Sequence, residues 1–415
     1  MRPIRYGMIG GGPGAFIGGV HRMAAALDGE FELVAGAFSS DPDRSAEMGQ
    51  ALNLDPARVY GAWSDLIALE AARPQAERID VVVVVTPNHL HHPVAKAALE
   101  AGFHVICDKP LTRTVDEAEE LARLVDHTGQ VFCVTHNYTG YPLVKEARER
   151  VRDGELGEVR KVVVEYSQGW LSTLLEAEGQ KQAAWRSDPA KAGISSALGD
   201  IGTHAHNLVE YVTGAGVTHL LADLGSVVPG RRLEDDAVVL LRLHRDRESG
   251  RAQPSATVIP PASGGDSTYV GPPGIRGVLI ASQVALGERN HLRLRIYGSD
   301  GALDWCQETP DELRLVEADG TERILHSGTA SLSQAAQAAT RLPAGHPEGF
   351  VEAFANVYRG VAQAIRAVAD GDRISHPQLD FPTVEAGVRG LRFVDAAVRS
   401  GREGGWVSLR EPQEH

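Results

Sequence analysis

The 415-residue chain contains little cysteine. Its three cysteines, Cys107, Cys133 and Cys306, are odd in number and lack the close spacing of metal-binding motifs. They predict reduced thiols rather than a disulfide framework, which favours a cytoplasmic protein. The start of the chain shows no basic stretch followed by an apolar segment and a cleavage site, so we expect no signal peptide.

Basic clusters and long apolar runs are missing as well. The formal net charge is −14 and the Lys and Arg residues are scattered, whereas nucleic-acid binding begins with a basic patch. No apolar run is long enough to cross a bilayer. The length and the 43% hydrophobic content predict two folded domains that bind neither nucleic acid nor membrane.

The first third of the chain alternates strand and helix patterns. The expected strands are residues 4–9, 31–38, 79–85, 104–107 and 130–135. The run IDVVVVV at 79–85 suits a parallel strand buried on both faces. Thr114 and Glu117 predict a capping box that opens a helix ending at Gly129. We therefore expect an α/β Rossmann domain with a doubly wound parallel sheet over residues 1–136.

The pattern changes in residues 137–415. A helix at 142–152 precedes a series of strands that few helices separate. These strands are expected to start at 158 and to include 237–243, 277–283, 292–297 and 313–316. They predict an α+β domain with a large open, mainly antiparallel sheet. Residues 246–276 are rich in Gly, Pro and Ser and indicate a loop insertion; the last helices are expected at 347–369 and 382–399, the final one packing back on the first domain.

A glycine-rich turn, GGGPGAFIG at residues 10–18, follows the first strand. Such a turn lets the backbone approach a pyrophosphate at the start of the next helix. The spacing is irregular, with Gly18 as the closing glycine three positions late, and a plain glycine-rich hairpin is the competing interpretation. Its place between a strand and a helix favours a dinucleotide. The expected cofactor contacts here are Gly10, Gly12, Pro13, Gly14, Phe16 and Ile17.

The end of the second strand should contact the cofactor ribose. Ser39 and Ser40 stand there, followed by Asp41 and Arg44. An acidic residue at this point favours NAD, whereas serines and an arginine can hold the 2′-phosphate of NADP. We expect contacts from Ser39, Ser40 and Arg44, and the choice between NAD and NADP stays open, with NAD preferred.

Three further motifs carry chemistry. They are TPNHLH at residues 86–91, DKP at 108–110 and GDIGTH at 199–204. The first two end neighbouring strands, at the edge where open α/β sheets bind ligands. Asp200 and His204 are four residues apart, which predicts one shared face of a helix.

In this order the motifs resemble the Gfo/Idh/MocA family, named after glucose–fructose oxidoreductase, inositol dehydrogenase and MocA. Its members carry a TPNxxH-type segment, an EKP signature and a DxGxH signature, and the YGSDG turn at 297–301 fits as well. The long glycine loop, Asp108 in place of Glu, and the insertion at 246–276 depart from the family. The resemblance implies pairing of the second-domain sheets into a homodimer or homotetramer.

The resemblance implies that Lys109, Asp200 and His204 form the catalytic set. His204 can take a hydroxyl proton near neutral pH, and Lys109 can offset the negative charge that develops on the same oxygen. Asp200 would position a substrate hydroxyl or His204 itself. Lys109 would instead be the base if desolvation lowered its pKa, and the sequence leaves both assignments open.

The remaining site residues are expected around this set. The other cofactor contacts are Thr86, Pro87, Asn88, His91, Asp108, Lys109 and Asn137. The expected substrate contacts are Lys109, Tyr138, Tyr166, Trp185, Arg186, Asp200 and His204. For Tyr166 and Trp170, a core or interface aromatic is the competing interpretation. His136 follows the last strand of the first sheet and is expected near the nicotinamide or substrate. His89 and His92 are interpreted as structural, and no metal site is predicted because no partner cluster has suitable spacing.

Three segments narrow the expected reaction. GGGPGAFIGGVHR near the start, the SSDP turn and PEGFVEAFANVY resemble family members that act on inositols, levoglucosan and glucosides. The resemblance implies NAD(P)-dependent oxidation of a secondary ring hydroxyl of a sugar or cyclitol to a ketone. The alternatives are an oxidoreductase or epimerase that never releases its cofactor and a non-catalytic NAD(P)-binding regulator.

Overall fold

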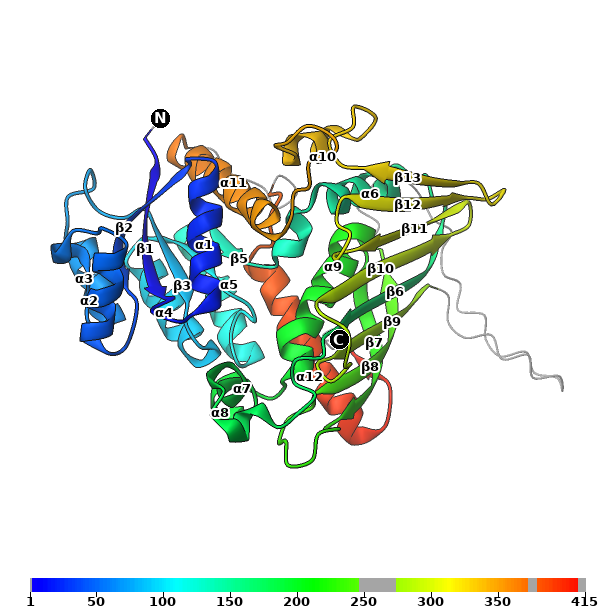
Figure 1. Cartoon of the computed structure of the whole chain (residues 1–415), viewed down its shortest axis with the longest axis horizontal. Coiled ribbons are helices and arrows are strands. Elements are labelled where there is room, and N and C mark those ends of the chain that lie inside the picture. The colour runs from blue at the N-terminus through cyan, green and yellow to red at the C-terminus, as the bar shows by residue number, and fades with distance from the viewer. Residues whose placement is uncertain (1, 246–273, 372–378, 410–415) are drawn as a thin grey trace.

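The structure, a computed structural model, describes residues 2–245, 274–371 and 379–409. Two sheets stand side by side, the first near the N-terminus and the second in the later part of the chain (Figure 1). The strands of the first sheet all precede residue 137, and those of the second all follow it. None of the described helices combines the length and apolarity needed to cross a membrane.

The first sheet is parallel, with the strand order β2-β1-β3-β4-β5. Its strands are β1 (Ile4–Gly10), β2 (Phe31–Ala37), β3 (Val81–Val85), β4 (His104–Cys107) and β5 (Phe132–Val134). The helices between them are α1 (Phe16–Leu27), α2 (Pro42–Ala51), α3 (Trp63–Ala71), α4 (His91–Glu100) and α5 (Val115–Thr128). Every residue of β3 is buried, as expected for a central strand covered on both faces. The predicted doubly wound sheet is confirmed.

The predicted capping box at the start of α5 forms only by half. The Thr114 hydroxyl accepts a hydrogen bond from the Glu117 amide at 3.2 Å. The Glu117 carboxylate does not return to the Thr114 amide but accepts from the Arg113 amide at 3.1 Å and from the Arg113 guanidinium. Gly129 ends the helix in the left-handed conformation, with φ of 67°.

The second sheet has the order β13-β12-β11-β10-β6-β9-β8-β7-β14 and is antiparallel except for the β6–β9 pair. Its strands are β6 (Val159–Ser167), β7 (Gly216–Gly225), β8 (Asp236–His244), β9 (Ile275–Ser282), β10 (His291–Gly298), β11 (Gly301–Cys306), β12 (Glu312–Glu317), β13 (Glu322–His326) and β14 (Val407–Ser408). The expected mainly antiparallel sheet is confirmed. Four of its strands, β7, β11, β13 and β14, were not predicted. The expected insertion at 246–276 ends earlier, because β9 begins at Ile275; residues 246–273 lie outside the described part.

Alternation along each strand places helices on one face of this sheet. In β10, Leu292, Leu294 and Ile296 are buried, whereas His291 and Arg293 lie on the opposite face. The covering helices are α6 (Pro142–Arg152), α9 (Thr203–Thr213) and α12 (Val384–Glu403) (Figure 1). The remaining short elements are α7 (Lys181–Arg186), α8 (Pro189–Ala192), α10 (Gln334–Ala339), η1 (Pro56–Arg58), η2 (Asn88–Leu90), η3 (Asn137–Gly140), η4 (Leu175–Glu178) and η5 (Leu198–Gly202).

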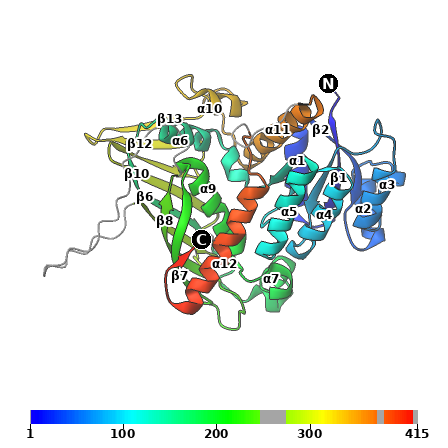
Figure 2. The ribbon, with the colours of Figure 1, turned by 180° about the vertical axis from the view of Figure 1, so that it is seen from behind.

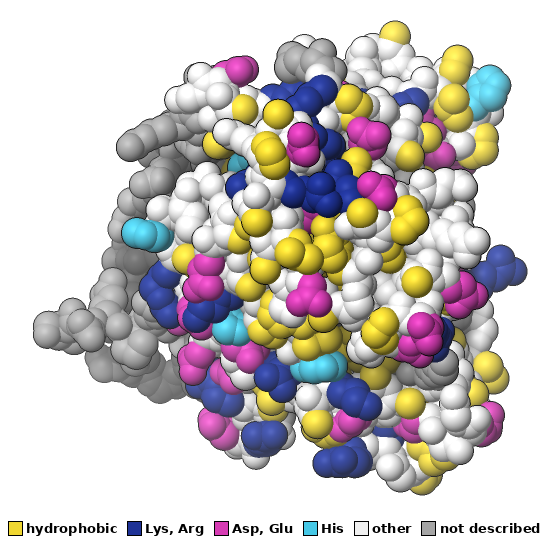
Figure 3. Space-filling model, turned by 90° about the vertical axis from the view of Figure 1, so that its left-hand side faces the viewer, with side chains coloured by type: hydrophobic (Ala, Val, Ile, Leu, Met, Phe, Trp, Pro, Cys, Tyr) yellow, Lys and Arg dark blue, Asp and Glu magenta, His cyan; other side chains and the backbone are white. Residues whose placement is uncertain are grey.

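The last two long helices connect the two sheets. α11 (Phe350–Ala369) packs on α1, and α12 contacts α5 and β5 as well as α9 and β7 (Figure 2). The Val134 amide donates to the Pro382 carbonyl at 2.9 Å, which ties the start of α12 to the edge of the first sheet. On the end of the molecule that the first sheet forms, basic and acidic side chains lie beside one another (Figure 3).

Buried histidines should make the fold sensitive to acid. Burial lowers the pKa of His21 and His104 to about 4 and that of His136 to about 3. Between these values and the usual 6.5, the unfolded chain binds protons that the folded chain does not, so stability falls as pH falls. Each histidine costs about 1.4 kcal/mol of unfolding free energy per pH unit in this window.

Urea unfolding at pH 7 and pH 5 checks this expectation, with a lower midpoint at pH 5. His104 accepts the Val131 amide at Nδ1, an acceptor role that glutamine can keep. His104→Gln should therefore reduce the difference between the two pH values, whereas His326→Gln on the outer strand β13 should leave it unchanged. Equal stability of the native chain at both pH values would contradict the argument.

Candidate active site

The glycine loop forms a cradle between β1 and α1. A Cβ atom on Gly12 would lie 2.6 Å from the carbonyl oxygen of Phe38, and one on Gly18 would lie 2.4 Å from the Cα of Gly11. Gly18 therefore allows α1 to pack against the turn, which is the part expected of the closing glycine. The six predicted contacts Gly10, Gly12, Pro13, Gly14, Phe16 and Ile17 all belong to this turn and the first helical residues. The cradle fits a pyrophosphate at the start of α1.

The end of β2 lies beside this loop. The Arg44 guanidinium donates to the Pro13 carbonyl at 3.0 Å, so α2 is tied to the glycine loop. Asp41 is the N-cap of α2 and accepts the Asp43 amide at 3.0 Å. Ser39 Oγ accepts the Asp41 amide, and Ser40 is exposed. The residues expected to contact the ribose are thus close to the glycine loop. The only carboxylate among them, that of Asp41, caps α2.

Two polar atoms near the strand ends are buried without a partner in the described part of the chain. They are Thr86 Oγ1, directly after β3, and Asn137 Nδ2, shortly after β5. A buried polar group without a hydrogen bond is costly, and a bound ligand can supply the missing partner. Both atoms belong to residues predicted to contact the cofactor, and they fit that expectation.

The rest of the TPNHLH segment is held by the protein. Asn88 donates to the Ala192 carbonyl at 3.2 Å. His91 is 1% exposed, and its two ring nitrogens lie 2.8 Å from the Pro110 carbonyl and 2.9 Å from the Thr86 carbonyl. A neutral imidazole donates from one nitrogen only, so one of these contacts is a hydrogen bond, and it joins the ends of β3 and β4 through the His91 ring. The cofactor contact expected from His91 stays a prediction.

Asp108 and Lys109 point to different partners. Asp108 Oδ1 accepts the Lys109 amide at 2.9 Å and the Thr135 hydroxyl at 2.8 Å, so the shorter carboxylate holds the backbone after β4 and β5. The Lys109 ammonium points away from the first sheet and reaches Asp200, which belongs to the part of the chain with the second sheet. Its Nζ donates to both the backbone oxygen and Oδ1 of Asp200, each at 2.7 Å.

Asp200 is the centre of this polar cluster. Besides Lys109, its carboxylate accepts from Arg186 Nε at 3.0 Å and from Gln283 Nε2 at 3.0 Å. Burial raises the pKa of Asp200, but the charges of Arg186 and Lys109 outweigh burial and hold the pKa well below its usual range. The carboxylate is therefore ionised and binds both cations.

The helix that carries Asp200 differs from the prediction. Residues Leu198–Gly202 form a π-helical turn, η5, before α9 begins at Thr203, so Asp200 and His204 do not share a regular α-helical face. Buried Glu234 anchors this turn, because its Oε1 accepts the Ser195 hydroxyl and the amides of Ser196 and Leu198. The wide turn places the Asp200 carboxylate against Lys109. The four-residue spacing between Asp200 and His204 did not predict this position.

His204 is 6% exposed and lies among other rings. Its Nδ1 is 3.4 Å from His136 Nδ1, and the Tyr138 ring packs edge-on at 4.8 Å. Burial, together with the nearby Lys109 charge, lowers the pKa of His204 well below 6.5. Its Nε2 has no hydrogen-bond partner among the described residues. A neutral imidazole with a free nitrogen is suited to accept a proton.

The rings of Tyr138 and Tyr166 pack against the ring of His204. The Tyr166 hydroxyl donates to Asn290 Oδ1 at 2.7 Å, and Asn290 Nδ2 donates to the Tyr138 hydroxyl at 3.1 Å. The two hydroxyls also hydrogen-bond each other. Both tyrosines are buried and pack against the His204 ring, an arrangement that favours a positioning role over a direct substrate contact.

Trp185 and Arg186 lie on α7 at the rim of the cluster. The Arg186 guanidinium stacks 4.2 Å from the centre of the Trp185 ring while its Nε holds Asp200. Gln283 and Asn290 completed the cluster without having been predicted. Gln283 ends the apolar run expected as a strand at 277–283, and a polar residue at such a strand end is the signal that would have revealed it.

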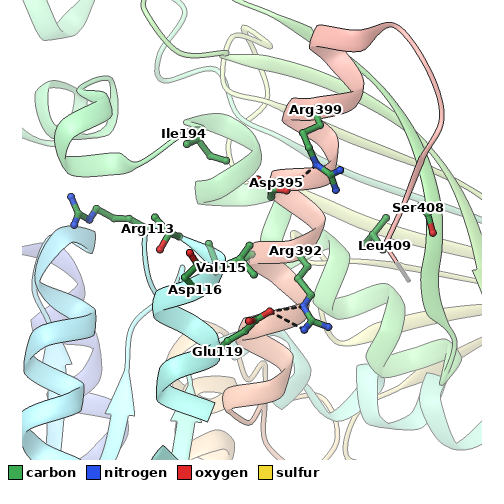
Figure 4. A pocket seen from close by; sticks show the side chains of 12 residues that line it. Arg113, Val115, Asp116, Glu119, Ile194, Arg392, Asp395, Arg399, Ser408 and Leu409 are labelled. Carbon is green, nitrogen blue, oxygen red and sulfur yellow. Dashed lines mark hydrogen bonds and ion pairs between the residues drawn. The ribbon is translucent and has the colours of Figure 1, made fainter. Parts of the chain in front are cut away.

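A separate surface cavity of about 460 Å³ lies between α5 and α12 (Figure 4). Arg113 and Ile194 line it, and ion pairs join Glu119 to Arg392 and Asp395 to Arg399. Neither Lys109 nor His204 lines this cavity. The polar cluster, and not this hollow, is therefore the candidate for chemistry.

Three family descriptions match the chain. "Oxidoreductase family, NAD-binding Rossmann fold" covers residues 4–136, "GFO/IDH/MocA C-terminal domain" covers 144–249, and "Oxidoreductase family, C-terminal alpha/beta domain" covers 272–409. The chain belongs to the Gfo/Idh/MocA family. It is an NAD(P)-dependent oxidoreductase of the dehydrogenase type, and the resemblance of its three motifs to this family is confirmed.

Relatives in this family match over the full length. "Uncharacterized oxidoreductase YfiI" of Bacillus subtilis (strain 168) is 33% identical, covering 99% of this chain and 98% of the relative. Levoglucosan dehydrogenase of Pseudarthrobacter phenanthrenivorans is 28% identical, with 99% of each chain covered. The inositol dehydrogenase homologue of Azotobacter vinelandii complexed with NAD+ has a TM-score of 0.88 at 37% identity, covering 98% of this chain and 97% of that one. The same protein complexed with NADH and myo-inositol has a TM-score of 0.86 at 36% identity, with 98% of each chain covered.

Proposed function

We propose that this enzyme oxidises a secondary ring hydroxyl of a cyclitol, sugar, anhydrosugar or glycoside to a ketone, reversibly and with NAD. The observation that carries the proposal is the Lys109 ammonium, held by Asp200 at 2.7 Å beside the neutral His204. Full-length relatives named for levoglucosan and inositol support the substrate class.

Lys109 is arranged as a donor to the reacting oxygen. An ammonium has three N–H groups, and two of them are used on Asp200. The third is free to donate to the substrate hydroxyl oxygen and to stabilise the negative charge that develops there. Asp200 thereby acts as a positioning residue for Lys109. The sequence predicted instead that it positions a substrate hydroxyl or His204.

His204 is the proposed base. If its Nδ1–H donates to His136 Nδ1, then Nε2 carries the lone pair that takes the hydroxyl proton. When bound, the nicotinamide accepts the hydride that leaves the carbinol carbon. The substrate C–H and O–H bonds break, the proton goes to His204, and the carbonyl forms against Lys109. Arg186 and Gln283 both donate to the Asp200 carboxylate, and we expect them to bind further ring hydroxyls.

The cofactor contacts remain the proposed ones of the glycine loop, the β2 end and the strand ends. Thr86 and Asn137 have unpartnered polar atoms for it, and the His91 ring lies between the ends of β3 and β4 beside them. We propose NAD over NADP because Arg44, the cation that would hold a 2′-phosphate, already donates to Pro13. The ratio of kcat/KM with the two cofactors decides this choice.

A polyol screen tests the proposed function. Purified enzyme is assayed with myo-inositol, scyllo-inositol, levoglucosan and simple glucosides, each with NAD and with NADP, at neutral to alkaline pH. We expect cofactor reduction with at least one polyol and a higher rate with NAD. No reduction of either cofactor with any polyol would overturn the proposal. Cofactor that stays bound through purification would instead favour the shuttling oxidoreductase or epimerase.

Assembly and location are proposed on separate observations. On the helix-free face of the second sheet, Val238 and Leu240 of β8 are 39% and 42% exposed, an apolar strip that supports a homodimer or homotetramer. The mass of the enzyme in solution tests this. All three cysteines are free thiols, which supports the cytoplasm as the place of work.

A further inference from the structure

Three potential metal ligands surround one histidine nitrogen on the second sheet, where β10 begins. His291 Nδ1 lies 3.6 Å from Glu288 Oε2, 3.8 Å from Glu308 Oε2 and 3.9 Å from Cys306 Sγ. His291 begins β10, Cys306 ends the neighbouring strand β11, and the two glutamates stand in the connecting loops. We propose that Glu288, His291, Cys306 and Glu308 form a zinc site.

The separations suit tetrahedral coordination. Zinc bonds of about 2.0–2.3 Å to nitrogen, oxygen and sulfur place neighbouring ligand atoms roughly 3.3–3.8 Å apart at the corners of a tetrahedron. The ligand atoms of Glu288, His291 and Glu308 all lie within 4.8 Å of one another. Cys306 Sγ lies 3.9 Å from His291 Nδ1 but outside this group of three, so a turn of its side chain towards the two carboxylates would complete the tetrahedron.

The other side of the His291 ring carries the partner expected of a metal-binding histidine. Its Nε2 lies 3.3 Å from Glu165 Oε1. When Nδ1 binds a metal, Nε2 carries the proton and donates it to an acceptor, and a carboxylate in that place fixes the tautomer and the ring orientation. Glu165 on β6 supplies this carboxylate.

The chemistry of the four donors selects zinc over magnesium or calcium. A thiolate and an imidazole are ligands of borderline-soft ions, whereas magnesium and calcium take oxygen ligands. Arg293, on the same strand as His291, is paired with Asp304 at 2.8 Å, so its charge is already compensated. The side chains of His291 and Glu308 are 21% and 34% exposed, which leaves a path for the ion.

The site adjoins the proposed active centre through one residue. Asn290 lies between Glu288 and His291, and its amide donates to Glu308 Oε1 at 3.0 Å. The Asn290 side chain holds Tyr138 and Tyr166, which pack against His204. Bound zinc would fix the β9–β10 connection and with it the tyrosine pair. The effect of zinc on catalysis rests on the proposed function, because it acts through His204. The metal site itself does not depend on the proposed function.

Zinc titration of the chelator-treated full-length enzyme tests the site. We expect one zinc per chain by competition with a chromophoric chelator, and at least a tenfold loss of affinity in His291→Gln. His326→Gln, on the outer strand β13, is the matched control and should bind like the native enzyme. Zinc should raise the melting temperature of the native chain and of the control, but not of His291→Gln.

Cobalt identifies the ligands independently of any activity. With Co²⁺ in place of zinc, we expect a thiolate charge-transfer band in the native enzyme and none in Cys306→Ser. Zinc binding that is equal in the native enzyme and in His291→Gln, or a cobalt spectrum without a thiolate band, would overturn the proposal. Because these readouts measure metal, they stand even if no polyol is oxidised.

Discussion

Lys109→Ala should lower kcat for polyol oxidation about 100- to 1,000-fold, the usual effect of removing one donor to a developing oxyanion. The variant loses the N–H that faces the reacting oxygen, and no other described ammonium bonds Asp200. Asp200 itself keeps Arg186 and Gln283, so the cluster is expected to stay folded around the missing side chain. Affinity for NADH should change little, because the glycine loop and the β2 end are untouched.

Steady-state kinetics and fluorescence titration with NADH separate these two effects. The matched control is Lys96→Ala, which removes an equivalent charge from α4, where Lys96 pairs with Glu120 at the surface. The control should keep the native kcat. A Lys109→Ala enzyme with native turnover would refute the role of Lys109, and a parallel loss of NADH binding would show that the residue serves the cofactor instead.

His204→Gln should lower kcat/KM about 100- to 10,000-fold, the range expected when a general base is removed. The base must be neutral, so activity is lost as pH falls through the pKa of His204. Burial and the Lys109 charge hold that pKa below 6.5. The native enzyme should therefore show no decline in rate at pH 6.5 from this group, with the acid limb at lower pH. In the variant that limb should disappear.

The pH profile of kcat/KM measures this, read together with the unfolding midpoint at each pH. His206→Gln provides the control: His206 lies on the same helix, is also buried, and stacks on the Phe393 ring. It should keep an acid limb and most of the activity. An unchanged profile in His204→Gln would transfer the base role to Lys109, the alternative that the sequence left open.

The regular elements were largely predictable because their signals are local. The five-valine strand β3, the glycine end of α5 and the strands of the first sheet follow from periodicity and end residues. The strands that were missed have weaker local patterns. β11, for example, starts with glycine and contains Asp304, and its place depends on pairing with β10 and β12. Strand pairing across a sheet depends on two segments at once, so the residues of one segment do not reveal it.

The residues of the site also fall into those that the sequence predicted and those that it did not. Lys109, Asp200 and His204 were found from their motifs, and they do come together. The supporting residues were not: Gln283 and Asn290 carry no motif, and Glu234 reaches the Asp200 turn from a distant loop. The sequence also does not show that the His91 ring lies between the Pro110 and Thr86 carbonyl oxygens.

The sequence by itself determined the family, the fold class of both sheets and the three residues that are proposed for the chemistry. These properties reside in short segments, where glycine placement, apolar period and motif order are directly visible. Only the tertiary structure decided that Lys109 donates to Asp200, that a π-helical turn presents this carboxylate, and that His291 meets Cys306. The physical reason is that hydrogen bonds and ligand clusters form between atoms brought within a few ångströms by sheet pairing and helix packing. Those distances depend on the whole fold and not on neighbours in the chain.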